Sequence, residues 1–266
     1  MMSEVAAKSA SLLSLEIEGR VARLTLTDPA SRNSLSSQMM QTISDTFDEI
    51  AGNADIAVVI LGAEGPVFSS GHNLKEVMSD NRQEVMLALF NQCSAMMQKI
   101  VNLPQPVIAK VDGIATAAGC QLVASCDLAF ATKSSRFATP GVNLGLFCST
   151  PMVALSRNVA PKHAMEMLLS GEFIDGENAM RFGLINKAVE PNELEDIVQK
   201  FAKNIASKST HTVKTGKAAF YKQVNMPLDQ AYDFASEVMA NNMQSHDAQE
   251  GIDAFLNKRE PDWQDK

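Results

Sequence analysis

Residues 68–77 read FSSGHNLKEV and residues 111–130 read VDGIATAAGCQLVASCDLAF, and these two stretches decide the expected fold and site. In each, small residues stand where a strand is expected to end and a helix to begin, at 69–73 and at 116–120. Backbone N–H groups at a helix start have no partner within the helix. Two such groups from different loops can converge on one carbonyl oxygen and stabilise its developing charge by about 3 kcal/mol per donor. Either stretch alone is more typical of a packing turn, so the prediction of an oxyanion hole depends on the pair.

Around these stretches, hydrophobic periodicity predicts strands that alternate with helices. Strands are expected over Leu13 to Glu18, Val21 to Thr27, Ile56 to Leu61, Pro106 to Val111, Asp127 to Thr132 and Leu184 to Val189. Helices are expected over Ser36 to Ala51, Arg82 to Val101, Pro151 to Val159, Lys162 to Ser170, Gly176 to Phe182 and Leu194 to Lys208, and the last 60 or so residues are expected to be wholly helical. This alternation predicts an α/β core with parallel crossovers.

The chain reads as one structural unit, because no linker and no internal repeat divides its 266 residues. We expect residues 1–200 to form the core that carries the site and residues 201–266 to form a helical oligomerisation region. Amphipathic helices without a core of their own often pack on a neighbouring subunit. The sequence therefore predicts a homo-oligomer.

Composition excludes several other classes of protein. The net charge of −8 argues against a nucleic-acid surface, and no apolar run reaches the roughly 18 residues that a membrane span needs. The four cysteines are too irregularly spaced for a disulfide framework or a zinc site, and no metal site is expected. The first residues have no apolar segment typical of a secretory leader, so we expect a cytoplasmic protein.

Together, the two stretches resemble the two-part signature of the crotonase superfamily, the enoyl-CoA hydratase/isomerase family. The resemblance continues through RFATPGVNLGLFCSTP, AMEMLLSGEFIDGENAMRFGLINKAV and EGIDAFLNKREPDW, and it covers residues 13–263. It implies a ClpP-like spiral of ββα units whose C-terminal helices form homotrimers, often paired into hexamers as dimers of trimers. It also implies a role in fatty acid metabolism with an acyl-CoA or enoyl-CoA thioester as ligand. Coenzyme A would enter as part of that substrate, with no tightly bound cofactor.

The resemblance assigns roles residue by residue. The backbone N–H groups of His72 and Ala118 would form the oxyanion hole around the thioester carbonyl. The loop from Ser70 to Lys75, which contains Gly71, Asn73 and Leu74, would meet the adenine end of CoA mainly through backbone carbonyls. Arg32 is a candidate for the CoA phosphates, although a solvated loop arginine is an equally good interpretation.

The two catalytic glutamates of the family's hydratases are replaced here by Gln121 and Gly141. Glutamine can orient a water molecule but cannot exchange a proton near neutral pH, and glycine has no side chain to contribute. Gly141 and Cys148 are expected to line the acyl pocket. Cys148 could act as a base only with a lowered pKa, and His72 only with its ring turned inward, whereas an outward ring is the expectation.

Two functions remain open on these residues. One is an enzyme, a hydratase-like lyase or an isomerase, in which Gln121 positions water and hydration is weak. The other is a non-catalytic protein that binds acyl-CoA, because both carboxylates are lost together. A scaffold without any ligand is disfavoured by the small residues retained at 117–119.

Overall fold

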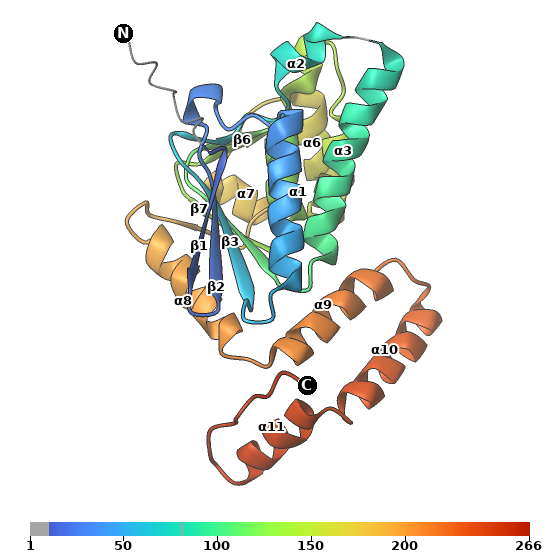
Figure 1. Cartoon of the computed structure of the whole chain (residues 1–266). Coiled ribbons are helices and arrows are strands. Elements are labelled where there is room, and N and C mark those ends of the chain that lie inside the picture. Colours follow the sequence, from blue (N-terminus) through green and yellow to red (C-terminus); the bar gives the residue numbers. More distant parts are fainter. Residues whose placement is uncertain (1–10, 81) are drawn as a thin grey trace, which may run out of the picture.

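The computed structural model describes residues 11–80 and 82–266, and it consists of two sheets joined by helical crossovers (Figure 1). The first ten residues, on which the cytoplasmic expectation depends, lie outside the described residues. The larger sheet has the order β1 (Leu13–Glu18), β2 (Val21–Leu26), β3 (Val58–Ala63), β5 (Val107–Val111), β7 (Leu128–Thr132) and β10 (Lys187–Val189). The smaller sheet has the order β4 (Val67–Ser69), β6 (Ile114–Thr116), β8 (Arg136–Ala138) and β9 (Ile174–Asp175).

A ββα unit repeats three times along the chain. In each unit one strand joins the large sheet, the next joins the small sheet, and one or two helices follow. These helices are α2 (Leu74–Ser79) and α3 (Gln83–Asn102), then α4 (Ala118–Ser125), then α5 (Ser149–Asn158) and α6 (Pro161–Ser170). Neighbouring strands of these units pair in parallel, with Leu61 opposite Ala109 and Ala109 opposite Ala129. The predicted α/β core with parallel crossovers is therefore confirmed.

Helices cover both faces of the large sheet. On β3, Val59 and Leu61 belong to the core shared with α1 (Ser37–Gly52), α3 and α4. The alternate residues, Val58 and Ile60, belong to a second core on the opposite face with α8 (Leu194–Ala206). Because successive side chains of a strand point to opposite faces, a strand buried on both sides reads as a continuous apolar run. This is the reason that IAVVIL at 56–61 shows no alternation.

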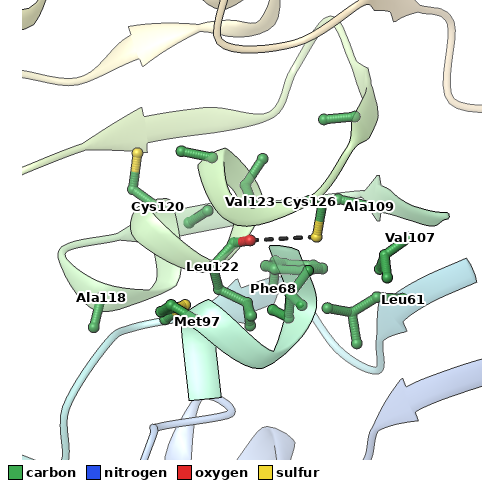
Figure 2. Close-up of a cluster of buried hydrophobic side chains, with 14 of the residues drawn as sticks. Leu61, Phe68, Met97, Val107, Ala109, Ala118, Cys120, Leu122, Val123 and Cys126 are labelled. Atoms are coloured by element: carbon green, nitrogen blue, oxygen red, sulfur yellow. Dashed lines mark hydrogen bonds between the residues drawn. The ribbon is translucent and has the colours of Figure 1, made fainter. Parts of the chain in front are cut away.

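Helix α4 lies at the centre of the molecule, and all eight of its residues are buried. Figure 2 shows Leu122 packed beside Phe68 and Met97, with Leu61 and Val107 nearby. The thiol of Cys126 donates a hydrogen bond to the carbonyl of Leu122 at 3.3 Å. Ala, Gly and Ser make up half of this helix, and their small side chains allow close packing against its neighbours, as at Gly119 beside Ser69 of β4. The four cysteines are all buried and free.

Some elements differ from the sequence expectation. Strands β4, β8 and β9 and the short helix α2 were not predicted, because segments of two to six residues are too short to show a period. The last strand is shorter than expected and begins at Lys187. The expectation of a wholly helical end was wrong, because α11 (His246–Leu256) is followed by a non-helical tail. That tail folds back: Asp247 accepts hydrogen bonds from the backbone of Gln264 at 2.8 Å and of Asp265 at 2.9 Å.

The expected division at residue 200 falls inside α8, whose Val198 and Ala202 both pack in the core. The helices that leave the core are α9 (Thr210–Gln223), α10 (Leu228–Asn242) and α11. Figure 1 shows α10 and α11 extending away from the sheets. Large apolar side chains are exposed along them and on the far part of α9, including Phe220, Val224, Leu228, Tyr232, Met239, Phe255 and Leu256.

A buried ion pair fixes α9 to the core. Lys217 Nζ lies 2.7 Å from Asp127 Oδ2, and it also donates to the carbonyls of Ile100 at 3.0 Å and Gln105 at 3.1 Å. Asp127 further accepts a hydrogen bond from the Tyr221 hydroxyl at 3.0 Å. Burial lowers the pKa of Lys217, and the charge of Asp127 opposes that shift. The pair therefore sets where the C-terminal helices begin.

Replacing Lys217 with methionine should lower the free energy of unfolding by about 3 kcal/mol, because Asp127 would keep a buried charge without its counterion. Urea denaturation at fixed protein concentration measures this. The matched control is Lys200→Met, since Lys200 is exposed on α8 and forms no ion pair with the described residues. Equal stabilities of the two variants would contradict the anchoring role.

Candidate active site

Residues 68–77 and residues 111–130 meet backbone to backbone. Gly71 has φ +83°, and a Cβ there would lie 2.9 Å from the Ala118 nitrogen and 3.0 Å from the Thr116 carbonyl. A Cβ on Gly119 would lie only 2.2 Å from the Ser69 carbonyl oxygen. Only glycine fits at either position, so the close approach of the loops requires both glycines.

Hydrogen bonds hold the two loops and the segment around Arg32 together. The Thr116 hydroxyl donates to the Ser70 carbonyl at 3.2 Å, which joins the two loops. The Ser70 N–H donates to the Arg32 carbonyl at 3.1 Å, and the Leu35 N–H donates to the Gly71 carbonyl at 2.8 Å. The backbone of Arg32 thus lies beside the 70–75 loop, and its contact with CoA phosphates stays a prediction.

The predicted oxyanion donors lie at this junction. His72 directly follows Gly71, and Ala118 is the first residue of α4, whose N–H has no partner within the helix. Neither the His72 N–H nor the Ala118 N–H donates to an acceptor anywhere in residues 11–80 and 82–266. The residues that carry these two free backbone donors therefore lie next to the contact between Gly71 and Ala118, and their joint role as an oxyanion hole stays a prediction.

Ala117, just before the second donor, has a strained backbone. Its φ of +50° and ψ of −119° lie in a region that residues with a Cβ rarely adopt. Its N–H donates to the Ala138 carbonyl at 2.9 Å, and its carbonyl accepts from the Gln121 N–H at 3.0 Å. Strain of this kind persists only where the surroundings enforce it, and it clusters at functional sites. Here the strained turn places Ala118 at the start of α4.

The side chain of His72 is buried against α3, and its expected orientation away from the acyl pocket stays a prediction. Its ring packs edge-on against Phe90 of α3, with ring centroids 5.3 Å apart. Both ring nitrogens are buried and lack a hydrogen-bond partner of proper geometry among the described residues. Burial lowers the pKa of His72, with small opposing effects from the Leu35 carbonyl and Glu76. The imidazole is therefore neutral near pH 7.

The 70–75 loop presents a mixed polar and cationic surface. Asn73 is the N-cap of α2, and its side-chain oxygen accepts a hydrogen bond from the Lys75 N–H at 3.1 Å. Asparagine caps helices as well as aspartate does, which accounts for a neutral residue here. Leu74 and Lys75 are exposed, and so is Arg32. Neither Lys75 nor Arg32 forms a salt bridge with the described residues.

Gly141 does not leave room for a missing carboxylate. A Cβ at this position would lie 2.9 Å from Cys148 Sγ and 2.9 Å from the Leu146 carbonyl oxygen. The chain from 141 to 148 therefore folds over the place where a longer side chain would lie. Burial raises the pKa of the Cys148 thiol, which contradicts a role as a base. Both residues stay predictions as parts of the acyl pocket.

Gln121 lies on the first turn of α4 and is 5% exposed, and its side-chain oxygen has no partner among the described residues. Thr139, between β8 and the short 3₁₀ helix Pro140–Leu144, shares these properties at 1% exposure. Sequence reasoning missed Thr139. The sequence does place this polar residue directly after the buried pair Phe137 and Ala138 and directly before the segment that contains Gly141, and that position could have drawn attention to it.

Two clefts lie away from these residues. One, of about 290 Å³, is bordered by Arg136, Phe173 and Arg181, and the other, of about 380 Å³, lies beside Lys217 and Tyr221. In the part of the chain that the structure describes, no group of His, Cys, Asp and Glu could hold a metal ion. No helix there has the length and apolar character to cross a membrane.

Comparison with known proteins gives a consistent result. The family profile described as enoyl-CoA hydratase/isomerase matches residues 16–266. The chain is 48% identical over 252 residues to enoyl-CoA hydratase domain-containing protein 3, mitochondrial, of Rattus norvegicus, covering 95% of this chain and 84% of that protein. The crystal structure of human enoyl coenzyme A hydratase domain-containing protein 3 has a TM-score of 0.93 at 47% identity, covering 95% of this chain and 100% of that one. The enoyl-CoA hydratase of Mycobacterium smegmatis has a TM-score of 0.94 at 46% identity, covering 95% and 99%.

The strain at Ala117 predicts an unusual response to glycine. Ala117→Gly should raise the free energy of unfolding by about 1 kcal/mol, because glycine adopts a positive φ without a Cβ penalty. Ala124→Gly, inside α4 where the backbone geometry is ordinary, should instead lower it by about 1 kcal/mol. Denaturant unfolding of both variants measures the difference. A loss of stability in both would show that Ala117 is not strained.

Proposed function

This chain belongs to the enoyl-CoA hydratase/isomerase family. We propose that it binds an acyl- or enoyl-CoA thioester and that the thioester carbonyl accepts hydrogen bonds from the His72 and Ala118 N–H groups. The observation that carries this proposal is the backbone contact at Gly71, which lies next to both residues that carry the unpaired donors. The crotonase-type fold of the solved relatives supports it.

The CoA part of the ligand would lie along the 70–75 loop. The diphosphate of CoA is anionic, and Arg32 and Lys75 are exposed cations beside the loop without salt bridges to the described residues. The backbone carbonyls of the loop would meet the adenine. Screening by solvent limits the gain from each such contact to a small value.

The chemistry that this site supports is addition of water to an enoyl thioester. Two N–H donors draw electrons toward the carbonyl oxygen, which makes C3 of the enoyl chain electrophilic. A water held by the Gln121 amide would form a bond from its oxygen to C3 and lose one proton, and one proton would be added at C2, so that H and OH are added across the C2–C3 double bond. The Gln121 amide cannot exchange a proton near neutral pH, and Gly141 has no side chain that could do so. Hydration should therefore be slow.

A non-catalytic acyl-CoA-binding protein is the second candidate. The observation in its favour is the crowding at Gly141, where the chain from 141 to 148 fills the space that a second carboxylate would need. In this case the oxyanion donors would serve affinity and not turnover. Isomerase chemistry needs a proton carrier in the same way as hydration and is equally weakened.

The assembly that we propose is a homotrimer or a dimer of trimers, formed through the exposed apolar side chains of α9, α10 and α11. Nucleic acid and membrane partners are not proposed. A cytoplasmic location stays a prediction, and the rat relative's name places that protein in mitochondria.

Calorimetric titration of crotonyl-CoA, with the enoyl absorbance followed in parallel, tests the proposal. We expect saturable binding with slow loss of absorbance. Gln121→Ala should lower the turnover at least 10-fold and change the affinity little, because its amide acts on water. Gln38→Ala, at an exposed position on α1, is the control.

Absence of binding to every CoA ester would contradict the proposed function. Binding without turnover would favour the second candidate over the enzyme. Unchanged turnover in Gln121→Ala would exclude Gln121 as the residue that holds water.

A further inference from the structure

Buried polar atoms without partners occur on three residues in or next to the two loops of the site. Six buried side-chain nitrogen or oxygen atoms lack a hydrogen bond within the described residues. Four of the six belong to His72, Gln121 and Thr139. Buried polar groups are nearly always paired, because leaving one unpaired costs free energy. Such a concentration therefore indicates groups that a ligand completes.

The main chain places Thr139 and Gln121 on either side of the strained turn. Thr139 follows Ala138, whose carbonyl accepts the Ala117 N–H at 2.9 Å. Gln121 is bonded through its own N–H to the Ala117 carbonyl, and it is three residues after Ala118 on the same helical face. The main chain at Gln121, and that of Ala138 just before Thr139, is thus bonded to the turn that presents the Ala118 donor.

The hydrogen-bonding capacities of the two side chains define what they can bind. Both unpartnered atoms are oxygens: that of Gln121 accepts only, whereas the hydroxyl of Thr139 accepts and donates. A group that satisfies both must donate at least one proton and can accept another. A hydroxyl or a water fits this requirement, and a saturated acyl chain does not.

We propose that Thr139 and Gln121 together bind a hydroxyl group beside the thioester, either the 3-hydroxyl of a 3-hydroxyacyl-CoA or the water that would become it. This inference rests on the proposed function and assigns Thr139 as a specificity residue for it. Neither side chain carries a charge between pH 5 and 9, so the pair selects a ligand by hydrogen bonding.

Isothermal titration of butyryl-CoA and 3-hydroxybutyryl-CoA into the full chain tests the inference. These ligands differ by one hydroxyl. The wild type should bind the hydroxylated ligand roughly 3- to 10-fold more tightly, as one or two net hydrogen bonds allow. Thr139→Val, which keeps the shape and removes the hydroxyl, should abolish this ratio and leave butyryl-CoA affinity unchanged. Thr139→Ser should restore it.

The outcomes distinguish a ligand hydroxyl from a bound water. They also distinguish failure of this inference from failure of the proposed function. If Thr139→Val abolishes the preference for 3-hydroxybutyryl-CoA over butyryl-CoA, Thr139 and Gln121 bind the hydroxyl of the ligand. If the variant keeps this preference but hydrates crotonyl-CoA several-fold more slowly, Thr139 and Gln121 bind the water. If Thr139→Val changes neither the ratio nor hydration, the inference is wrong while thioester binding stands. If the wild type binds neither ligand, the proposed function itself fails.

Discussion

The structure depends on one constraint, the contact of two backbones at Gly71 and Gly119. With a Cβ on Gly119 only 2.2 Å from the Ser69 carbonyl, any other residue would push β4 away from α4. The same contact sets Gly71 against the Ala118 nitrogen, next to both residues that carry the free donors. Helix α4 can pack this closely against β4 only because this approach is allowed. Fold and site therefore share a single steric requirement.

Much of this could be predicted from the sequence. Long strands and helices show their period, and the two glycine-containing stretches show where strands give way to helices. The rest depends on contacts between segments far apart in the chain. The packing of the His72 ring is set by Phe90, the crowding at Gly141 by Cys148, and the strain at Ala117 by Ala138. Thr139 was not predicted, because a single buried threonine has no pattern in the sequence that marks it.

The buried polar side chains next to the two donors are neutral. His72 is held uncharged by burial, and Gln121 and Thr139 do not titrate near pH 7. Electrostatic help for a ligand at this junction therefore comes from backbone dipoles, which favour negative charge on a carbonyl oxygen but cannot move a proton. Such a site is well suited to holding a polarised thioester and poorly suited to fast acid–base chemistry. This balance explains why an enzyme and a binding protein are both consistent with the same geometry.

The most direct test of the central claim is difference infrared spectroscopy of crotonyl-CoA labelled with ¹³C at the thioester carbonyl. If the His72 and Ala118 N–H groups both bind the oxygen, the carbonyl stretch of the bound ligand should move to lower frequency than that of the free ligand, because polarisation weakens the C=O bond. The shift should persist in Gln121→Ala, since that side chain does not donate to the carbonyl. A ligand that binds with an unshifted carbonyl band would contradict the oxyanion hole.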